Sequence, residues 1–553
     1  MNLLDRFLVK TDFDSYEDFK ANLKFKIPEN FNFAYDVVDE YARLTPEKTA
    51  MVWCNDSGKE KVISFSEMKT YTDKTANVLI KHGIKKGDFV MLMLMTRYEF
   101  WYVLLALHKI GAIAIPATHQ LTAKDIKYRC DAADIKAIIC INKPDVIEYV
   151  RNAKQASPNL KKIFCLGENE DFINFYEEFD SASAALGLKK PTKNTDPLLM
   201  YFTSGTTGLP KMVVHNHLYP LAHIVTGKYW HNIDDDCLHF TSADTGWAKA
   251  SWGKIYGQWI AGGVIFTYDY LGKFFALDLL PLLEKYGVDT FCAPPTVYRY
   301  LIKEDLVKYK FNKMKYFTTA GEPLNPEVLK QFESKTTHKI FEGFGQSETV
   351  ILLGTFIWME PKPGSMGKPN PLYDISLIDD DGNEVGLMEE GEMVIKMTSD
   401  IIGITSGYYK DPEKTAALFE NGFFHTGDLA YKDGDGYYWF IGRKDDIIKS
   451  SGYRIGPFEV ESALIEHPCV LECAVVGVPD PLRGQLIKAN IVLANGYSPS
   501  DELIIELQNH VKRVTAPYKY PRIIEFVDKL PKTISGKLKR REIRQNERTE
   551  DSQ

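Results

Sequence analysis

The stretch DFVMLMLMTRYEFWYVLLALHKIGAIAIP, residues 88–116, decides the fold. It begins with an apolar run, continues through a helical pattern and ends on a second apolar run, AIAIP. Strands that are apolar on both faces and alternate with helices indicate a parallel sheet covered by helices on both sides. We therefore expect an α/β fold, and we interpret the interrupted apolar run 100–117 as a buried helix and strand with no membrane span.

The same alternation extends along the chain in both directions. It runs from a capping box, SFSE, at 64–67 to about Gly167, and it returns over 288–345. From about Asp374 short strands alternate with turn clusters, which indicates a β-rich subdomain. We predict a large N-terminal domain of two doubly wound sheets plus this subdomain, and a small mobile C-terminal α+β domain. The predicted boundaries are 1–442 for the first domain, 443–446 for a hinge and 447–553 for the second, with 544–553 as a frayed tail.

Composition narrows the classes of function. A chain of 553 residues exceeds the roughly 250 to 300 at which one core stops growing, so several domains are expected. The net charge of -8 argues against a nucleic-acid partner, which normally requires a basic face. Eight scattered cysteines without a CxxC pair indicate reduced, buried thiols. Asp5 and Arg6 interrupt the segment that would have to be the apolar core of a signal peptide, so secretion is not expected. We therefore expect a cytoplasmic protein.

The segment TSGTTGLPK, 203–211, is a candidate phosphate-binding loop. Its glycines let the backbone approach an anion, and its four hydroxyls add donors. A Walker-type loop requires a lysine directly after the last glycine and a hydroxyl after the lysine. Here Leu209 and Pro210 precede Lys211, and Met212 follows it. Taken alone, the segment is also compatible with a surface turn rich in serine, threonine and glycine.

Five further motifs follow in order. They are AGEP (320–323), EGFGQSET (342–349), FHTGD (424–428), GRKDDIIK (442–449) with SGYRIGP (451–457), and PKTISGK (531–537). Together with the loop they resemble the adenylate-forming, AMP-binding superfamily of acyl-CoA synthetases, luciferases and peptide-synthetase adenylation domains. The resemblance covers about 35–545 and is greatest to the medium-chain acyl-CoA synthetases. It implies an AMP-forming acid–CoA ligase: a carboxylic acid and ATP give acyl-AMP and pyrophosphate, and CoA then gives acyl-CoA and AMP.

The resemblance implies the nucleotide site. Phe344 offers a flat face to adenine where the family commonly has tyrosine, and Ser347 keeps the hydroxyl of the usual threonine. Asp428 suits the ribose hydroxyls, Arg443 suits ribose or phosphate, and Glu348 suits Mg²⁺ as the only predicted metal ligand. The predicted ATP/AMP-binding set is Thr203, Ser204, Gly205, Thr206, Thr207, Gly208, Lys211, Gly321, Glu322, Pro323, Glu342, Gly343, Phe344, Gly345, Gln346, Ser347, Asp428 and Arg443.

The resemblance also implies the catalytic and CoA-binding residues. Lys537 and Glu348 are predicted to be catalytic, because a placed cation such as Lys537 stabilises the charge that builds up as one anion attacks another. Lys537 and Gly452 serve different steps, so the family relationship implies rotation of the C-terminal domain about a hinge at Asp445. The predicted CoA-binding set is Gln120, Ser451, Gly452, Tyr453, Arg483, Lys512 and Tyr520.

The predicted acyl pocket contains Gly345, Trp247, Trp259 and Arg454. Acetate-specific relatives carry tryptophan at the position of Gly345, so glycine predicts open space. Trp247, Trp252 and Trp259 are candidate walls, and at least one of the three is expected to be an ordinary core residue. We therefore expect an acid larger than acetate, either short and branched, medium-chain or aryl. The predicted partners are this acid, ATP and CoA, with the chain acting as a monomer or homodimer.

Three alternatives are weaker. A peptide-synthetase module would be expected to carry a carrier domain after Lys537 and an acidic pocket residue for the amino group. The CoA-like positions favour a ligase over a luciferase-like oxygenase. A regulatory protein without catalysis would be expected to lack Lys537 or Glu348, and both are present.

Overall fold

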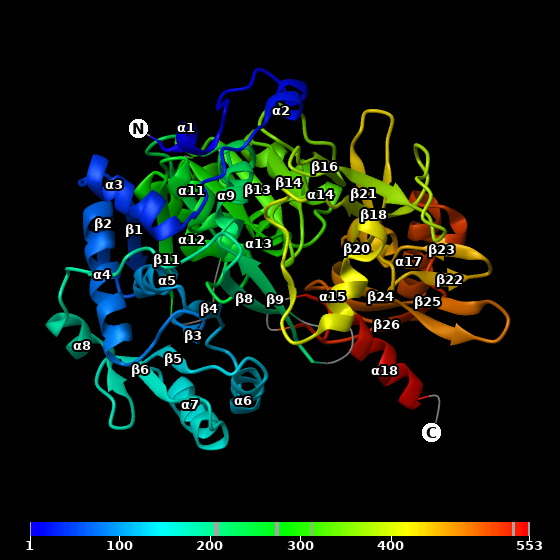
Figure 1. Cartoon of the computed structure of the whole chain (residues 1–553). Helices are drawn as coiled ribbons and strands as arrows, with labels where there is room; N and C mark the ends of the chain where they lie inside the picture. Colours follow the sequence, from blue (N-terminus) through cyan, green and yellow to red (C-terminus); the bar gives the residue numbers. More distant parts are fainter. Residues whose placement is uncertain are drawn as a thin grey trace.

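The computed structural model describes residues 2–203, 209–270, 276–309, 311, 313–533 and 537–550. Within these ranges the strands form sheets of eight, thirteen and five strands. Figure 1 shows the early helices α4 and α7 on one side of the molecule and the strands of the five-stranded sheet on the other. The confirmed fold class is α/β, with a large N-terminal domain of several sheets and a C-terminal α+β domain. The exact boundaries and the hinge stay predictions.

The eight-stranded sheet contains the opening stretch of the sequence analysis. Its parallel centre consists of β4, β3, β5 and β6, all of which were predicted as strands. Between β3 and β4 runs α5 (Glu99–Ile110), which is buried along its whole length and ends at Gly111 in the left-handed conformation. The side chain of Lys109 on this helix is buried, and its Nζ pairs with Oδ1 of Asp39 at 2.7 Å and with Oδ1 of Asp73 at 2.6 Å. In sheet order the strands are β19 (Gly407–Tyr408), β9 (Lys211–Asn216), β8 (Pro197–Thr203), β4 (Ile113–Pro116), β3 (Phe89–Met93), β5 (Ala137–Ile141), β6 (Lys162–Leu166) and β7 (Ile173–Asn174).

Helices cover this sheet as the sequence pattern predicts. The predicted capping box is present at the start of the first of them, where Ser64 accepts from the amide of Glu67 and the carboxylate of Glu67 accepts from the amide of Ser64. The covering helices besides α5 are α4 (Phe65–Lys81), α6 (Ala123–Ala132) and α7 (Pro144–Ala156).

The thirteen-stranded sheet joins two regions that the sequence separates. Its parallel part contains β12, β13 and β14, the three strands predicted for the second sheet, together with β10, β11 and β1, which were not predicted. Most of its antiparallel part is the β-rich segment. The strands β15 and β16 connect the halves by hydrogen bonds, so the β-rich segment continues the sheet instead of standing apart. In sheet order the strands are β17 (Ile375–Ile378), β18 (Gly391–Lys396), β20 (Phe423–Lys432), β21 (Tyr438–Arg443), β16 (Ser365–Pro369), β15 (Leu353–Gly354), β14 (Ile340–Phe344), β13 (Tyr316–Ala320), β12 (Thr290–Ala293), β10 (Leu238–Thr241), β11 (Val264–Asp269), β1 (Thr49–Asn55) and β2 (Glu60–Ser64).

The C-terminal α+β unit has a hydrophobic core of its own, drawn from residues 448–526. Its last helix, α18 (Arg540–Glu550), corrects the predicted frayed tail, because Ile543 is buried and Arg544 pairs with Asp446 at 2.9 Å. The strands are β23 (Tyr453–Ile455), β22 (Ile448–Ser450), β25 (Gly484–Leu493), β24 (Val470–Asp480) and β26 (Ile523–Phe526), and the other helices are α16 (Pro457–Ile465) and α17 (Asp501–Val514).

All eight cysteines are buried and free, as the scattered spacing predicts. In the part of the chain that the structure describes, none of the helices has the length and apolar character needed to cross a bilayer.

Candidate active site

The predicted phosphate loop connects two antiparallel strands. β8 ends at Thr203, β9 begins at Lys211, and the two residues are paired across the hairpin. The predicted contacts Ser204, Gly205, Thr206, Thr207 and Gly208 lie outside the described residues. A Walker-type loop leads from a strand into a helix. The hairpin connection therefore excludes that alternative.

Glu348 and Lys211 come together through a tyrosine that the sequence analysis did not select. The hydroxyl of Tyr408 donates to Oε1 of Glu348 at 2.9 Å, and Nζ of Lys211 lies 3.5 Å from the same hydroxyl. Burial and the charge of Glu348 raise the pKa of Tyr408, so this hydroxyl remains a donor. Lys211 and the carboxylate of Glu348 thus both contact one neutral phenol hydroxyl, next to the predicted phosphate loop.

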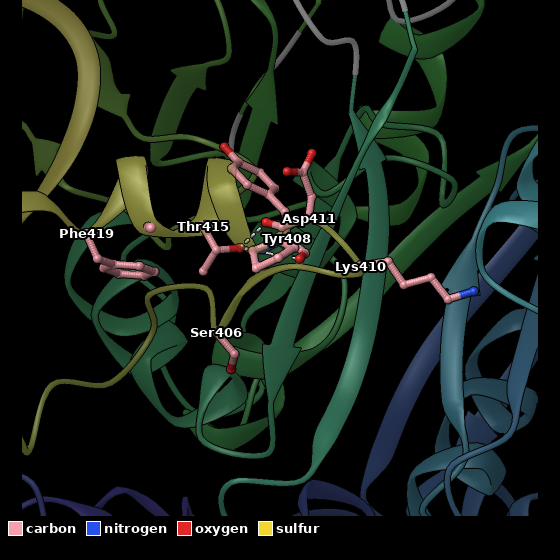
Figure 2. A pocket seen from close by; sticks show the side chains of 8 residues that line it. Ser406, Tyr408, Lys410, Asp411, Thr415 and Phe419 are labelled. Atoms are coloured by element: carbon pink, nitrogen blue, oxygen red, sulfur yellow. Dashed lines mark hydrogen bonds between the residues drawn. The ribbon is translucent and has the colours of Figure 1, made fainter.

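A cavity of about 610 Å³ adjoins this group. Figure 2 shows Tyr408, Asp411 and Thr415 close together, with Lys410 pointing away from them. Oγ1 of Thr415 accepts from the amide of Tyr408 at 2.9 Å, and Lys410 pairs with Asp134 at 2.5 Å. The cavity is lined by β19 and by helix α15 (Pro412–Leu418), so Tyr408 separates it from Glu348.

Three predicted nucleotide contacts form one network. Asp428 on β20 and Arg443 on β21 are paired residues of adjacent strands, and Nη1 of Arg443 lies 3.2 Å from Oδ1 of Asp428. Nε2 of Gln346 donates to Oδ2 of Asp428 at 2.5 Å. Burial raises the pKa of Asp428, against the lowering effects of Arg443 and Gln346. A buried carboxylate with two fixed donors and further lone pairs is suited to accept hydroxyl groups.

The AGEP segment forms an open turn after β13. Gly321 has φ +102°, and a Cβ built on it would meet nothing within 4 Å, so the space in front of the turn is free. Nζ of Lys249, at the start of α10 (Lys249–Gly253), donates to the carbonyl of Ala320 at 2.7 Å. Oε2 of Glu322 accepts from the hydroxyl of Thr296 at 3.1 Å. Burial lowers the pKa of Lys249, and its hydrogen bond to Ala320 holds this lysine at the turn.

The charge of Lys537, in the C-terminal domain, lowers the pKa of both Lys249 and Asp428. On either side of this lysine, Lys532 binds Glu472 at 2.7 Å, and Arg540 binds both oxygens of Glu461 at 2.7 and 2.6 Å. Lys537 is exposed, and its carbonyl accepts from the amide of Thr533 at 2.7 Å.

Most of the predicted CoA residues lie on the outer face of the C-terminal domain. Tyr453 stacks on Tyr518 with ring centroids 4.0 Å apart, and Lys512 lies over the ring of Tyr520 at 4.2 Å. The amide of Ser451 donates to the carbonyl of Arg483 at 2.9 Å, and Gly452 is exposed beside it. Gln120 comes from the loop after β4, and no contact joins it to the others in the described residues.

The acyl pocket differs from the prediction at three residues. Trp259 is fully buried, with its indole N–H bonded to the carbonyl of Ala50, so it is a core residue and no pocket wall. Nη1 of Arg454 pairs with Oδ2 of Asp380 at 3.3 Å. The space beside Gly345 is filled, because a Cβ there would lie 2.5 Å from the ring of Trp252.

Of the other tryptophans, Trp247 is half-buried in the turn before α10, and Trp252 packs on Gly345. Trp230 takes the corresponding place beside Gly343, where a Cβ would lie 2.5 Å from its ring. Both glycines of EGFG therefore make room for indole rings. The spacing in the sequence does not show which of Trp252 and Trp259 packs on Gly345, because this depends on the orientation of helices 249–253 and 256–260.

Two residues that the sequence analysis did not select, Lys249 and Tyr408, contact residues of the predicted site motifs. Lys249 is a charge within the otherwise apolar segment 246–253, and this contrast was the available signal. Tyr408 carried no signal, because nothing in the sequence links it to Glu348. The packing of β19 against β9 brings it there.

Glu342 supports the turn from behind. One carboxylate oxygen accepts from the amide of Leu324 at 3.1 Å, and the side chain is buried. Burial raises the pKa of Glu342 to about 8. The carboxyl group is thus protonated at neutral pH and holds the amide that follows the AGEP turn. The predicted contact of Glu342 with the nucleotide stays a prediction.

The raised pKa predicts a pH-dependent stability. The folded chain binds this proton more tightly than the unfolded chain, so the stabilisation is complete below pH 4.5 and is lost as the pH rises to about 8. The slope is about 1.4 kcal/mol per pH unit. Glu342→Gln keeps the acceptor without the titration, so its melting temperature should fall less between pH 5 and pH 8. Glu360→Gln, at a glutamate 80% exposed, is the control, and equal pH slopes for Glu342→Gln and the parent would contradict the assignment.

Comparison with known proteins gives consistent results. The family model "AMP-binding enzyme" matches residues 38–409, and "AMP-binding enzyme C-terminal domain" matches residues 459–537. The chain is 42% identical to Acyl-coenzyme A synthetase ACSM3, mitochondrial, of Rattus norvegicus, over 98% of this chain and 95% of that protein. It is 43% identical to Acyl-coenzyme A synthetase ACSM5, mitochondrial, of Homo sapiens, over 94% and 91%. The crystal structure of the anthranilate CoA ligase AuaEII in complex with anthranoyl-AMP is similar with a TM-score of 0.87 and 26% identity, over 95% of this chain and 99% of that one.

These relatives correct one prediction. Their names place them in mitochondria, so the expected cytoplasmic location is wrong. Scattered, reduced cysteines indicate a reducing compartment, but they do not show which reducing compartment it is. The matches to both family models, together with relatives aligned over nearly the whole chain, show that the chain belongs to the AMP-binding enzymes and, within them, to the acyl-coenzyme A synthetases.

Proposed function

We propose that the chain activates a carboxylic acid larger than acetate through the site around Asp428, Lys249 and Lys537. A carboxylate is a poor acyl electrophile, because its leaving group would be an oxide. Its attack on the α-phosphate of ATP gives an acyl-AMP, from which a thiol displaces a phosphate monoester. The observation that carries the proposal is the buried Asp428, which is held by Gln346 and Arg443 from two other motifs and whose pKa is raised by burial and lowered by the charge of Lys537. Cations fixed near the reacting phosphate stabilise the charge that builds up there.

Each part of the nucleotide has a proposed binding group. Asp428, held by Gln346 and Arg443, takes the ribose hydroxyls. Phe344 on β14 takes the adenine face, and Lys211 binds the outer phosphates from the start of β9. The phosphate loop thus holds the leaving pyrophosphate, while Lys537 acts at the α-phosphate.

Glu348 is the proposed Mg²⁺ ligand. Mg²⁺ is usually held by one or two carboxylates together with substrate phosphates, so one protein carboxylate is sufficient. The carboxylate of Glu348 keeps oxygen lone pairs beyond the hydrogen bond from Tyr408, which fits this ion. When bound, Mg²⁺ would neutralise phosphate charge.

The proposed acid is short and branched, medium-chain or aryl. The name of one similar structure, an anthranilate CoA ligase with anthranoyl-AMP, supports an aryl acid, and the similarity to the ACSM synthetases supports an aliphatic one. We expect two indole rings to limit the length of the acid toward the EGFG segment: Trp252, which lies beside Gly345, and Trp230, which lies beside Gly343.

Trp252→Ala should therefore lengthen the accepted acid. Removing the indole next to Gly345 opens space, and each methylene group that enters should raise relative kcat/KM about 10-fold or more. Loss of a buried tryptophan also lowers stability, by about 3 to 5 kcal/mol. The measurement is kcat/KM over a series of straight acids, with Trp439→Ala in the β-rich segment as control. An unchanged order of preference would show that Trp252 does not line the pocket. Gly345→Trp is expected to disrupt folding, because a Cβ at position 345 has no room.

The function is tested by product analysis. Incubation with ATP, a panel of carboxylic acids and Mg²⁺, with and without CoA, should release AMP and pyrophosphate, with acyl-CoA forming only when CoA is present. Formation of ADP in place of AMP would overturn the proposed reaction.

A further inference from the structure

A histidine and a carboxylate meet where the two large sheets approach each other. His119 follows β4, Asp244 follows β10, and Nδ1 of His119 lies 3.8 Å from Oδ2 of Asp244. The segments are in close contact, because a Cβ on Gly246 would lie 2.3 Å from the amide nitrogen of Thr118. The amide of Gly246 donates to Oδ1 of Asp244 at 2.7 Å, which fixes the carboxylate and leaves Oδ2 for the imidazole.

The two ring nitrogens of His119 have different surroundings. Nδ1 is buried and has no hydrogen-bond partner among the residues that the structure describes, while the side chain keeps 14% of its surface exposed. Nε2 is therefore the nitrogen open to an incoming group. A carboxylate facing Nδ1 favours a proton on that nitrogen and leaves Nε2 as a base. The 3.8 Å separation is typical of a catalytic pair that tightens when substrate binds.

The charges around the pair keep the imidazole neutral. Burial lowers the pKa of His119, and Lys143 lowers it further, against the raising effects of Asp244 and Asp145. Lys143 and Asp145 face the ring from the start of α7, and Lys254 faces Asp244 from the end of α10. Burial also raises the pKa of Asp244. A neutral histidine at pH 7 is able to accept a proton.

The position of the pair connects it with the second half of the reaction. Gln120, the next residue after His119, is one of the proposed CoA contacts. The segment 244–249 starts at Asp244 and ends at Lys249, which binds Ala320 beside the open turn at Gly321. One short segment thus extends from the histidine pair to the proposed adenylate site, and no other residue assigned so far is a base for the thiol.

We propose that His119 is the general base for the CoA thiol, with Asp244 as the positioning residue that orients it. The proposal rests on the proposed acyl-CoA synthetase reaction. The S–H proton moves to Nε2, sulfur bonds to the acyl carbon, and the bond from that carbon to the phosphate oxygen breaks, so AMP leaves as a phosphate monoester. The imidazolium then releases the proton to solvent. A thiol with a pKa near 8.5 is only a few per cent ionised at pH 7, and general-base catalysis contributes about 10² to 10⁴-fold.

The test separates the two half-reactions. In His119→Gln, pyrophosphate release with ATP and acid should equal that of the parent, while the single-turnover rate of thioester formation from preformed acyl-AMP and CoA should fall about 10²-fold at pH 7. The defect should shrink as the pH is raised to 9.5, because the thiol then ionises without a base. Asp244→Asn should show a smaller defect with the same pH trend, and added imidazole should restore part of the rate of His119→Ala.

His338→Gln is the matched control, because this half-buried histidine packs on Phe317 away from the pair. It should leave both half-reactions unchanged. A His119→Gln variant that loses both half-reactions equally, or that raises only the KM for CoA with an unchanged pH profile, would overturn the general-base role. Failure of the parent itself to release pyrophosphate would instead overturn the proposed function.

Discussion

Lys537→Ala should lose adenylation by about 10² to 10³-fold, the effect of removing one placed charge from a transition state. The charge of Lys537 lowers the pKa of both Lys249 and Asp428 in this structure, which supports the proposed role of this cation at the α-phosphate. Thioester formation from supplied acyl-AMP and CoA should be retained, because the thiol attacks the acyl carbon in that step and no bond to the α-phosphorus forms or breaks. Pyrophosphate release and acyl-CoA formation, measured separately, check both halves of this expectation.

Lys539→Ala is the control for Lys537→Ala. Lys539 lies two residues further on, is 46% exposed in its side chain and pairs with Glu542 at 3.1 Å. Its loss removes the same formal charge from the same surface and should leave both half-reactions intact. Equal losses in the two half-reactions of Lys537→Ala would point to a general defect of the C-terminal domain and would contradict the assigned role.

Asp445→Pro should lower the rate of thioester formation by about 10²-fold, the effect of a misplacement of about 1 Å in a reacting group, and should spare adenylation. In this structure the charge of Lys537 lowers the pKa of Asp428, while Gly452 is exposed. We propose that the second step requires the C-terminal domain to turn. Proline fixes φ near −65° and restricts the preceding residue, which opposes a rotation at this point.

Asp445→Ala separates the backbone from the carboxylate. The carboxylate of Asp445 lies 3.7 Å from Nε of Arg443, a partly exposed pair that contributes little. Alanine should therefore leave both steps nearly unchanged, and proline alone should block the second. Comparable losses of both steps in Asp445→Pro would count against a hinge.

The parallel sheets were predictable because burial on both faces leaves a strong local pattern. The runs at 89–93, 113–116, 137–141 and 162–166 are all strands, as the alternation predicts. Helix α18 was not predictable in the same way, since few of its residues are apolar and its position depends on Arg540 with Glu461 and on Arg544 with Asp446. Such ion pairs join residues far apart in the sequence and have no periodic signature.

The site residues that lie in sequence motifs were predictable, whereas the contacts that depend on tertiary packing were not. Asp428, Gln346 and Arg443 come from separate motifs and meet in the structure. The filled space at Gly345 was not predictable, because an absent side chain does not reveal which neighbour takes its place. The partners of Arg454 and of His119 lie in distant segments for the same reason.

The continuity of the thirteen-stranded sheet has a consequence for the way the enzyme opens. Phe344 on β14 and Asp428 on β20 lie at opposite ends of a hydrogen-bonded series in which β15, β16 and β21 intervene. Local unfolding at either end removes pairing from the next strand, so these five strands are expected to open as one cooperative unit. Amide hydrogens on both sides of the nucleotide should therefore exchange with solvent at matching rates, and a bound adenylate should slow all of them together.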